Sequence, residues 1–415
     1  MPADRDSIPG YPAGPGYPTG GVRLCGLGLR LAGVRGPADL AAQLTGRVVA
    51  PRVPRLLTAE HSDLEPVERC VHGPVEVRMP DGVPPRGLRN LPRESLLSLA
   101  AAAEAAATAT GPQPGVGPVA GIGPVAATGP LAGGGSERDV DVPDGGEEPP
   151  GAVVWVSSTA GLTEYAGICV EAAVLEPGLS SPMMGPAAAF NAPAATVSIR
   201  LGLRGPNETL TGGAAAGIGA FVEAVRILAT GEASEVLLGG SATVSRWSVV
   251  AGTGAELPAE GAVCLALGLR TRDDRAGDGA PGADDRATGD APDAGRRTGA
   301  GPVPGDVAGI HLGRFRRVGL DPARPVEEVR RLVAEFTRPA AIVVSTPDAA
   351  LAAALRASGP GPAWHVERTL GDFGAAGGLL AVAGAAALVS TTGADVLALA
   401  VEPSGYAALV EVGPC

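Results

Sequence analysis

The chain has 415 residues, of which 45% are hydrophobic and only 3% are aromatic, and its formal net charge is −12. A chain of this length usually folds around two cores rather than one. The acidic charge argues against nucleic acid or an anionic membrane surface as the main partner, because both are recognised through basic patches. It also makes an acidic carrier protein an unexpected ligand for this chain alone.

The cysteines and the N-terminus indicate the compartment. The cysteines lack the spacing of a metal site or a disulfide framework, and they occur at Cys25, Cys70, Cys169, Cys264 and Cys415. The first residues lack the apolar core of a signal peptide, and the alanine-rich run at residues 97–109 carries Glu104 and is too short to cross a bilayer. We therefore expect a cytoplasmic protein that uses no cofactor and no metal ion.

The predicted elements begin after a tail. Residues 1–21 are rich in Pro and Gly and are expected to be flexible. Residues 22–31 alternate as a strand does, and residues 91–109 have the apolar spacing of a helix. Residues 45–90, between them, contain no long periodic segment.

Two long segments are predicted to be loops inserted into a compact fold. Residues 110–151 and 271–305 are dominated by Gly, Pro, Ala and charged residues, and they have little apolar surface to bury. Structureless loops of this length are uncommon inside a domain, which is why insertion is the simplest interpretation.

The remaining segments predict an alternation of strands and helices. Strands are predicted at residues 152–157, 235–239, 341–345 and 395–401, and helices at residues 214–230, 349–357 and 374–390. Gly231 follows the helix at 214–230 in the position of a C-terminal cap. This alternation predicts a layered α/β architecture with mainly parallel sheets.

One segment carries a family resemblance. Residues 201–217 read Leu-Gly-Leu-Arg-Gly-Pro-Asn-Glu-Thr-Leu-Thr-Gly-Gly-Ala-Ala-Ala-Gly, which resembles the nucleophile region of β-ketoacyl synthases. The flanking motifs agree in order and spacing: Ser181-Pro-Met-Met184, Phe190-Asn191, the strand end Glu235-Val-Leu-Leu-Gly-Gly-Ser241, Ala259-Glu260-Gly261-Ala262 and Gly374-Ala-Ala-Gly377. The resemblance runs from about residue 22 to residue 412, excluding the two loops.

The resemblance implies a thiolase-like, five-layer αβαβα fold built from two similar halves, residues 22–250 and 251–415. It also implies a dimer whose interface lies beside the nucleophile region. In the family, a cysteine thiolate at a helix N-terminus accepts an acyl chain from a carrier protein, because the helix dipole and free amides lower the thiol pKa. Two histidines then promote decarboxylation of the malonyl extender.

The reactive groups of the family are missing at the matching positions. Ala214 stands at the nucleophile position, Thr346 stands nearest to the first histidine position, and Gly371 occupies the second. The oxyanion and gating loop of the family remains only as a short segment that contains Gly405 and Tyr406. The sequence therefore predicts a chain that cannot perform the condensation by itself.

Members without catalysis are known in this family as chain-length factors, which pair with an active ketosynthase. We therefore expect a heterodimer with such a ketosynthase in polyketide or fatty acid biosynthesis, with an acyl carrier protein reached only through that subunit. Candidate tunnel or interface residues are Met183, Met184, Phe190, Gly212, Gly213 and Ala216. Two alternatives stay open: a diverged acyltransferase or malonyl decarboxylase that uses other groups, and an acyl-binding homodimeric scaffold.

Several polar residues are expected to have structural roles. His365 is predicted to lie in a strand with a local partner, whereas His72 stands alone in the sequence. Glu260 is expected to be held by backbone amides. Cys169 is predicted to be a buried structural thiol, since no basic neighbour would activate it.

Overall fold

The computed structural model describes residues 21–58, 65–81, 83–109, 151–174, 182–251, 257–269, 307, 309–321, 323–336, 339–358 and 361–414. The predicted tail at 1–21 and the predicted loops at 110–151 and 271–305 lie outside these residues, apart from Gly21 and Gly151. No described helix is long and apolar enough to cross a membrane.

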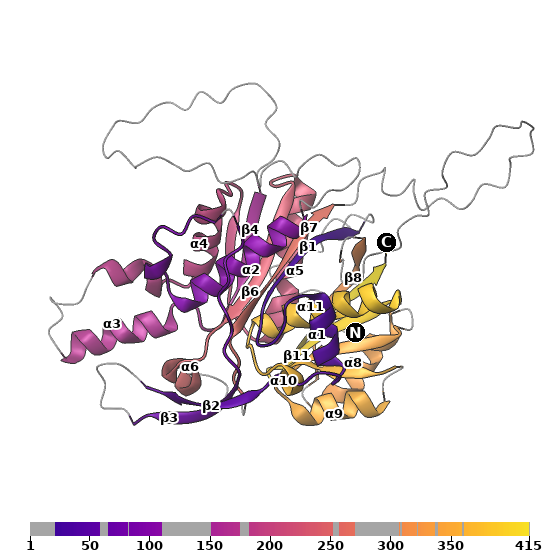
Figure 1. The fold of residues 1–415 in the computed structure, drawn as a ribbon. Coiled ribbons are helices and arrows are strands. Elements are labelled where there is room, and N and C mark those ends of the chain that lie inside the picture. The colour runs from indigo at the N-terminus through magenta and orange to yellow at the C-terminus, as the bar shows by residue number, and fades with distance from the viewer. Residues whose placement is uncertain are drawn as a thin grey trace, which may run out of the picture.

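The described elements alternate along the chain (Figure 1). The strands are β1 (Val22–Arg30), β2 (Arg52–Leu57), β3 (Val67–His72), β4 (Gly151–Val156), β5 (Asn207–Leu210), β6 (Glu235–Ala242), β7 (Gly261–Leu269), β8 (Ile310–Gly319), β9 (Ala341–Ser345), β10 (Ala363–His365), β11 (Val396–Glu402) and β12 (Tyr406–Pro414). The helices are α1 (Pro37–Leu44), α2 (Arg93–Ala109), α3 (Leu162–Val174), α4 (Ala192–Leu201), α5 (Ala214–Thr230), α6 (Arg246–Ala251), α8 (Pro325–Ala334), α9 (Ala349–Ser358), α10 (Val366–Thr369) and α11 (Ala376–Thr392), with short 3-10 turns η1 (Leu88–Asn90) and η3 (Pro182–Ala188).

The main sheet is built from two halves with the same topology. Its strand order is β10-β9-β11-β12-β8-β1-β7-β6-β4-β5 among the described residues. Read outward from the junction between β1 and β8, one half has the order β1-β7-β6-β4-β5 and the other has the order β8-β12-β11-β9-β10. The corresponding strands follow one another in the same chain order, and they form the same parallel and antiparallel pairs. The halves meet where the start of β1 pairs with β8.

Two features of the sheet differ from the sequence-based expectations. The sheet is mixed, so the prediction of mainly parallel sheets is wrong: only residues 403–405 separate β11 from β12, and so short a connection returns the chain antiparallel. In addition, β7 lies between β1 and β6. The strand order therefore divides the chain after β7, whereas the sequence analysis divides it between residues 250 and 251.

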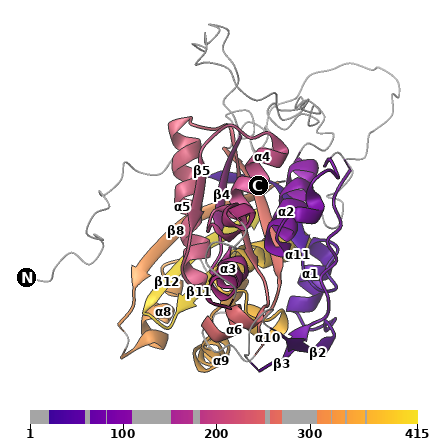
Figure 2. The ribbon, with the colours of Figure 1, turned by 90° about the vertical axis from the view of Figure 1, so that its left-hand side faces the viewer.

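Neighbouring residues of the central strands face different layers, as the pleat of a strand requires. In β4, Val154 packs in the central core, whereas Trp155 packs beneath α2 and α4. In β9, Val343 packs in the central core, whereas Val344 packs beneath α8 and α9. With α5 and α11 between the half-sheets, these clusters form the predicted αβαβα layers (Figures 1 and 2).

A two-stranded hairpin lies where the sequence contains no periodic segment. β2 pairs antiparallel with β3, with Arg52 opposite His72 and Leu57 opposite Val67. Most side chains of this hairpin are exposed. The alternation of apolar and polar residues by which a strand is usually identified is therefore missing from its sequence.

The two central helices touch through their backbones. A β-carbon on Gly378 of α11 would overlap the carbonyl oxygen of Ala214, and one on Gly217 of α5 would lie 2.5 Å from the carbonyl oxygen of Ala375. Both glycines therefore permit an approach that no other residue allows. This crossing fixes the first turn of α5 against the first turn of α11.

We predict that Gly378→Ala destabilises the fold by roughly 2–4 kcal/mol, because the added methyl must push two packed helices apart. Gly219→Ala on the outer side of α5 is the matched control, since its β-carbon would lie 4.0 Å from the nearest atom outside its own helix, Nη1 of Arg317. The control should unfold within about 1 kcal/mol of the parent, or be more stable. Equal urea midpoints for the two variants would contradict the close crossing.

A buried carboxylate opens strand β6. Glu235 is only 5% exposed, and neither of its carboxylate oxygens has a hydrogen-bond partner among the described residues. Burial raises the pKa of Glu235 to about 7. In the unfolded chain the group returns toward its ordinary pKa of 4.5, so the folded state loses stability as the pH rises from 4.5 to about 7.

We therefore predict that Glu235→Gln unfolds at a higher temperature than the parent at pH 8, by an amount equivalent to roughly 2–3 kcal/mol. Near pH 4.5 the two proteins should differ much less, because the parent carboxyl is then protonated in the folded state and only half ionised in the unfolded chain. Thermal midpoints measured between pH 4.5 and pH 8 test this. A difference that does not change with pH would show that Glu235 does not titrate in this window.

Candidate functional site

The predicted nucleophile position, Ala214, lies at the start of α5 after a turn of two glycines. β5 leads into Gly212, whose φ of 152° favours glycine, and Gly213 then forms the N-cap without a side-chain hydrogen bond. Ala214 is the first residue of the helix and is buried. Its methyl group faces the end of the helix where free amides and the dipole would stabilise an anion.

A carboxylate from another strand reaches this helix start. A β-carbon on Gly213 would lie 2.9 Å from Cδ of Glu402, the last residue of β11. Ser404 donates a hydrogen bond to Glu402, with 2.9 Å between Oγ and Oε2. The negative charge suits a helix N-terminus and would oppose a second anion there, such as a thiolate.

The remnant of the gating loop is part of a tight strand connection. Gly405 has a φ of 88° in the turn between β11 and β12, and Tyr406 pairs with Glu402 across that turn. The Tyr406 ring is 46% exposed, and the guanidinium of Arg317 lies 5.9 Å from its centroid. The side chain of this segment that reaches Gly213 is therefore Glu402, which the sequence analysis did not identify.

The first histidine position is filled by a polar cluster. Thr346, after β9, donates its backbone N–H to Oε2 of Glu367 at 3.0 Å, and Ser345 donates its hydroxyl to Oε1 of the same carboxylate at 2.5 Å. His365 lies 2.7 Å from the Thr346 carbonyl oxygen and 3.0 Å from Oε2 of Glu367. The prediction that His365 has local partners is confirmed, and the cluster packs against Gly377 in the first turn of α11.

The second histidine position is suited only to glycine. Gly371 has a φ of 97°, and a β-carbon there would lie 2.6 Å from Cβ of Ala259. The same β-carbon would lie 3.2 Å from Cδ2 of His72. A histidine at residue 371 would be strained in its backbone and crowded in its side chain.

His72 therefore lies close to residue 371, although the two residues are far apart in the sequence. It lines a small cavity of about 10 Å³ together with Gln43 and Glu260, and neither ring nitrogen has a partner among the described residues. Burial, with a smaller contribution from the charge of Arg52, lowers the pKa of His72. The imidazole is thus held neutral and apart from Ala214.

Glu260 is held by arginines rather than by backbone amides, so that expectation is wrong. Arg93 donates to both carboxylate oxygens, at 3.2 and 2.6 Å, and Arg55 donates to one at 3.2 Å. Burial opposes ionisation of Glu260, but the hydrogen bonds and charges of the two arginines outweigh it and keep the pKa below its ordinary value. Three hydrogen bonds from two charged guanidinium groups therefore hold this carboxylate in place.

The comparisons with known proteins agree with this geometry. The family model described as Beta-ketoacyl synthase, N-terminal domain matches residues 139–259. The solved ishigamide ketosynthase/chain length factor is similar at 19% identity and a TM-score of 0.63, covering 95% of this chain and 99% of that one. Residues 139–259 thus match the N-terminal domain of β-ketoacyl synthases, and the chain as a whole has the fold of that solved structure.

Further solved structures have the same fold. A type II PKS acyl-carrier protein in complex with its ketosynthase, bound to the hexaketide, gives 12% identity and a TM-score of 0.61, with 96% of this chain and 100% of that chain covered. A β-ketoacyl synthase from Burkholderia phymatum gives 13% identity and a TM-score of 0.58, with 95% and 99% covered. A search of curated proteins finds no match.

The residues predicted to line a tunnel or an interface fall into two groups. Gly212, Gly213 and Ala216 lie together at the start of α5, where a β-carbon on Gly212 would be 2.9 Å from Cβ of Ala216. Met183 lies in η3, and the Met184 methyl lies 3.7 Å from the β-carbon position of Gly167 on α3. Phe190 follows η3 and is exposed.

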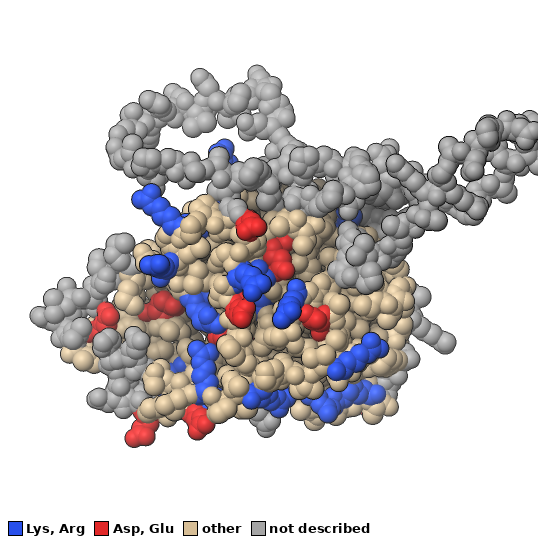
Figure 3. Space-filling view, in the orientation of Figure 1, with Lys and Arg blue, Asp and Glu red and all other residues tan. Residues whose placement is uncertain are grey.

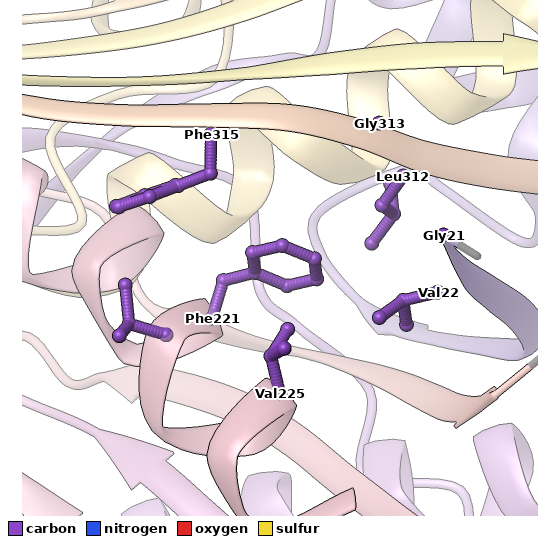
Figure 4. A pocket seen from close by; sticks show the side chains of 8 residues that line it. Gly21, Val22, Phe221, Val225, Leu312, Gly313 and Phe315 are labelled. Carbon is purple, nitrogen blue, oxygen red and sulfur yellow. The ribbon is translucent and has the colours of Figure 1, made fainter. Parts of the chain in front are cut away.

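A separate apolar pocket lies farther along α5, between this helix and β8 (Figure 4). Phe221 and Val225 point from the helix toward Leu312 and Phe315, and Val22 closes one side. The cavity volume is about 80 Å³. The described residues that line it are apolar side chains and glycines.

The described cysteines lie in different environments. Cys264 is buried, and burial together with the charge of Glu235 raises its pKa. Cys70 and Cys169 are exposed, so the prediction that Cys169 is buried is wrong: it lies on the outward side of α3. The described residues contain no group of His, Cys, Asp and Glu side chains that could hold a metal ion.

We predict that Ala214→Cys introduces a thiol whose pKa is not strongly lowered, because the Glu402 carboxylate opposes the helix dipole. In Ala214→Cys/Glu402→Gln the thiol pKa should fall by about one unit or more. The rate of iodoacetamide labelling of the peptide carrying residue 214, followed against pH, measures both values. A strongly lowered pKa in the single variant, unchanged by Glu402→Gln, would contradict this role of Glu402.

Proposed function

We propose that this chain is a non-catalytic partner subunit of an active ketosynthase, with a role like that of a chain-length factor in polyketide or fatty acid biosynthesis. The observation that carries the proposal is the methyl group of Ala214 at the start of a helix whose backbone geometry is otherwise retained. A methyl group accepts no acyl chain, and neither Thr346 nor Gly371 offers an imidazole. The retained geometry then serves shape and assembly rather than reaction.

An uncovered apolar surface supports a partner. We call it the α3 surface, and its exposed side chains are Tyr165, Val174, Phe190, Ile199 and Val250. They lie on α3, α4 and α6 and beside η3, elements that contact one another in series and face the viewer in Figure 2. Helix α3 is rich in apolar residues, yet none of its residues is buried. Exposed apolar patches of this kind mark protein interfaces.

The sheet edge next to this surface is also open. β5 is the last strand of the main sheet and pairs only with β4 among the described residues. An unpaired edge offers backbone hydrogen bonds to a second subunit. We propose that the ketosynthase covers β5 and the α3 surface through an interface of at least roughly 2,000 Å², as obligate complexes do.

The charge of the chain supports an indirect contact with the carrier protein. On the face drawn in Figure 3, acidic side chains lie among the arginines over the central part. Arg30 is paired with Glu104, and Arg93 is paired with Glu260. The formal net charge of −12 would repel an acidic carrier protein, so we propose that the active subunit binds it, in the cytoplasm.

Co-expression with the ketosynthase encoded nearest to this chain tests the proposal. We predict a stable complex in size exclusion chromatography that Ile199→Glu disrupts, because a charge would be buried in the interface. Val49→Glu is the matched control, since Val49 is 76% exposed and Ile199 is 77% exposed, but Val49 lies outside the α3 surface. No complex with the parent chain, or equal loss in both variants, would contradict the proposal.

A further inference from the structure

A buried carboxylate with no role at the start of α5 lies beneath the α3 surface. Glu94, in the first turn of α2, is 5% exposed. It accepts hydrogen bonds from four hydroxyl groups: Ser157 at 2.5 Å, Ser241 at 2.8 Å, Thr159 at 3.0 Å and Thr243 at 3.3 Å. We call these five residues the hydroxyl cluster. Its carboxylate is satisfied by hydroxyl donors, without a basic partner among these contacts.

The hydroxyl groups come from two separate chain connections. Ser157 and Thr159 follow β4 and precede α3, whereas Ser241 and Thr243 lie at the end of β6 and precede α6. The Ser157 hydroxyl also accepts the backbone N–H groups of Thr159 and Ala160, at 3.0 and 2.9 Å. The carboxylate of Glu94 thus joins the segments that precede α3 and α6 to α2.

The positions of α3 and α6 depend on these contacts at their N-terminal ends. α3 contributes no buried residue, so core packing restrains it little. It contacts α6, and Thr163 at its base donates a hydrogen bond to Ser245, with 2.9 Å between the hydroxyl oxygens. The hydroxyl cluster is joined to that contact along the chain, because Thr243 precedes Ser245 and Thr159 precedes Thr163 by a few residues.

We infer that Glu94 is a positioning residue for partner binding: its contacts with the ends of β4 and β6 set the orientation of α3 and α6 and so shape the surface offered to the ketosynthase. The inference rests on the proposed function for the identity of the partner. The link from Glu94 to α3 and α6 is a property of the free chain and can be measured without any partner.

Glu94→Gln keeps the size of the side chain but replaces one acceptor oxygen by a donor, which two hydroxyl groups must then turn to accommodate. We expect amide hydrogen exchange within 162–174 and 246–251 of the free chain to accelerate at least about tenfold, while exchange in α5 and α11 stays within about twofold of the parent. Glu235→Gln is the matched control, because it makes the same change at the other end of β6. It should leave exchange in α3 unchanged.

If Glu94→Gln does not fold, Thr243→Val is the second variant, because valine has nearly the shape of threonine but lacks its hydroxyl group. Thr243→Val should accelerate amide hydrogen exchange in the same segments by a smaller factor. Unchanged exchange in α3, or an equal rise in α3, α5 and α11, would overturn the inference. Binding to the ketosynthase should weaken about tenfold or more in Glu94→Gln and not in Glu235→Gln. If the parent chain binds no ketosynthase, the proposed function fails, and the exchange result still decides whether Glu94 positions α3.

Discussion

The backbone contact between α5 and α11 is the constraint on which the rest of the structure depends. Gly378 lies against the carbonyl oxygen of Ala214, and Gly217 lies against that of Ala375, so the helices approach more closely than side chains would permit. Both half-sheets pack on this helix pair. The contact therefore fixes the start of α5 relative to β9 and β11, whatever side chain stands at residue 214.

The backbone at the start of α5 can consequently keep its conformation when the side chains around it change. The crossing glycines keep the turn at Gly212 and Gly213 in place, while each position that would carry a reactive group has a stable alternative. Thr346 is bound to Glu367, and Gly371 is packed against Ala259 with a left-handed backbone. Such replacements fit a subunit that is retained for its shape, and they explain why restoring one reactive side chain would not restore the others.

Local signals predicted much of the fold, and long-range contacts account for what was missed. The helix at 214–230 and the strand at 341–345 have the predicted bounds, because caps and buried runs identify them. Glu402 beside Gly213, and His72 beside Gly371, could not be predicted, since each pair joins residues far apart in sequence. The arginine partners of Glu260 lie 167 and 205 residues away. Exposed α3 was missed for another reason: its apolar composition is also that of a core helix.

The most direct test of this account is intact-protein mass spectrometry of the complex between this chain and its ketosynthase after incubation with acyl and malonyl thioester donors. The account predicts an acyl adduct on the ketosynthase subunit alone, with the mass of this chain unchanged. A stoichiometric acyl adduct on this chain would contradict it, because it would require a nucleophile that the retained geometry at Ala214 does not supply.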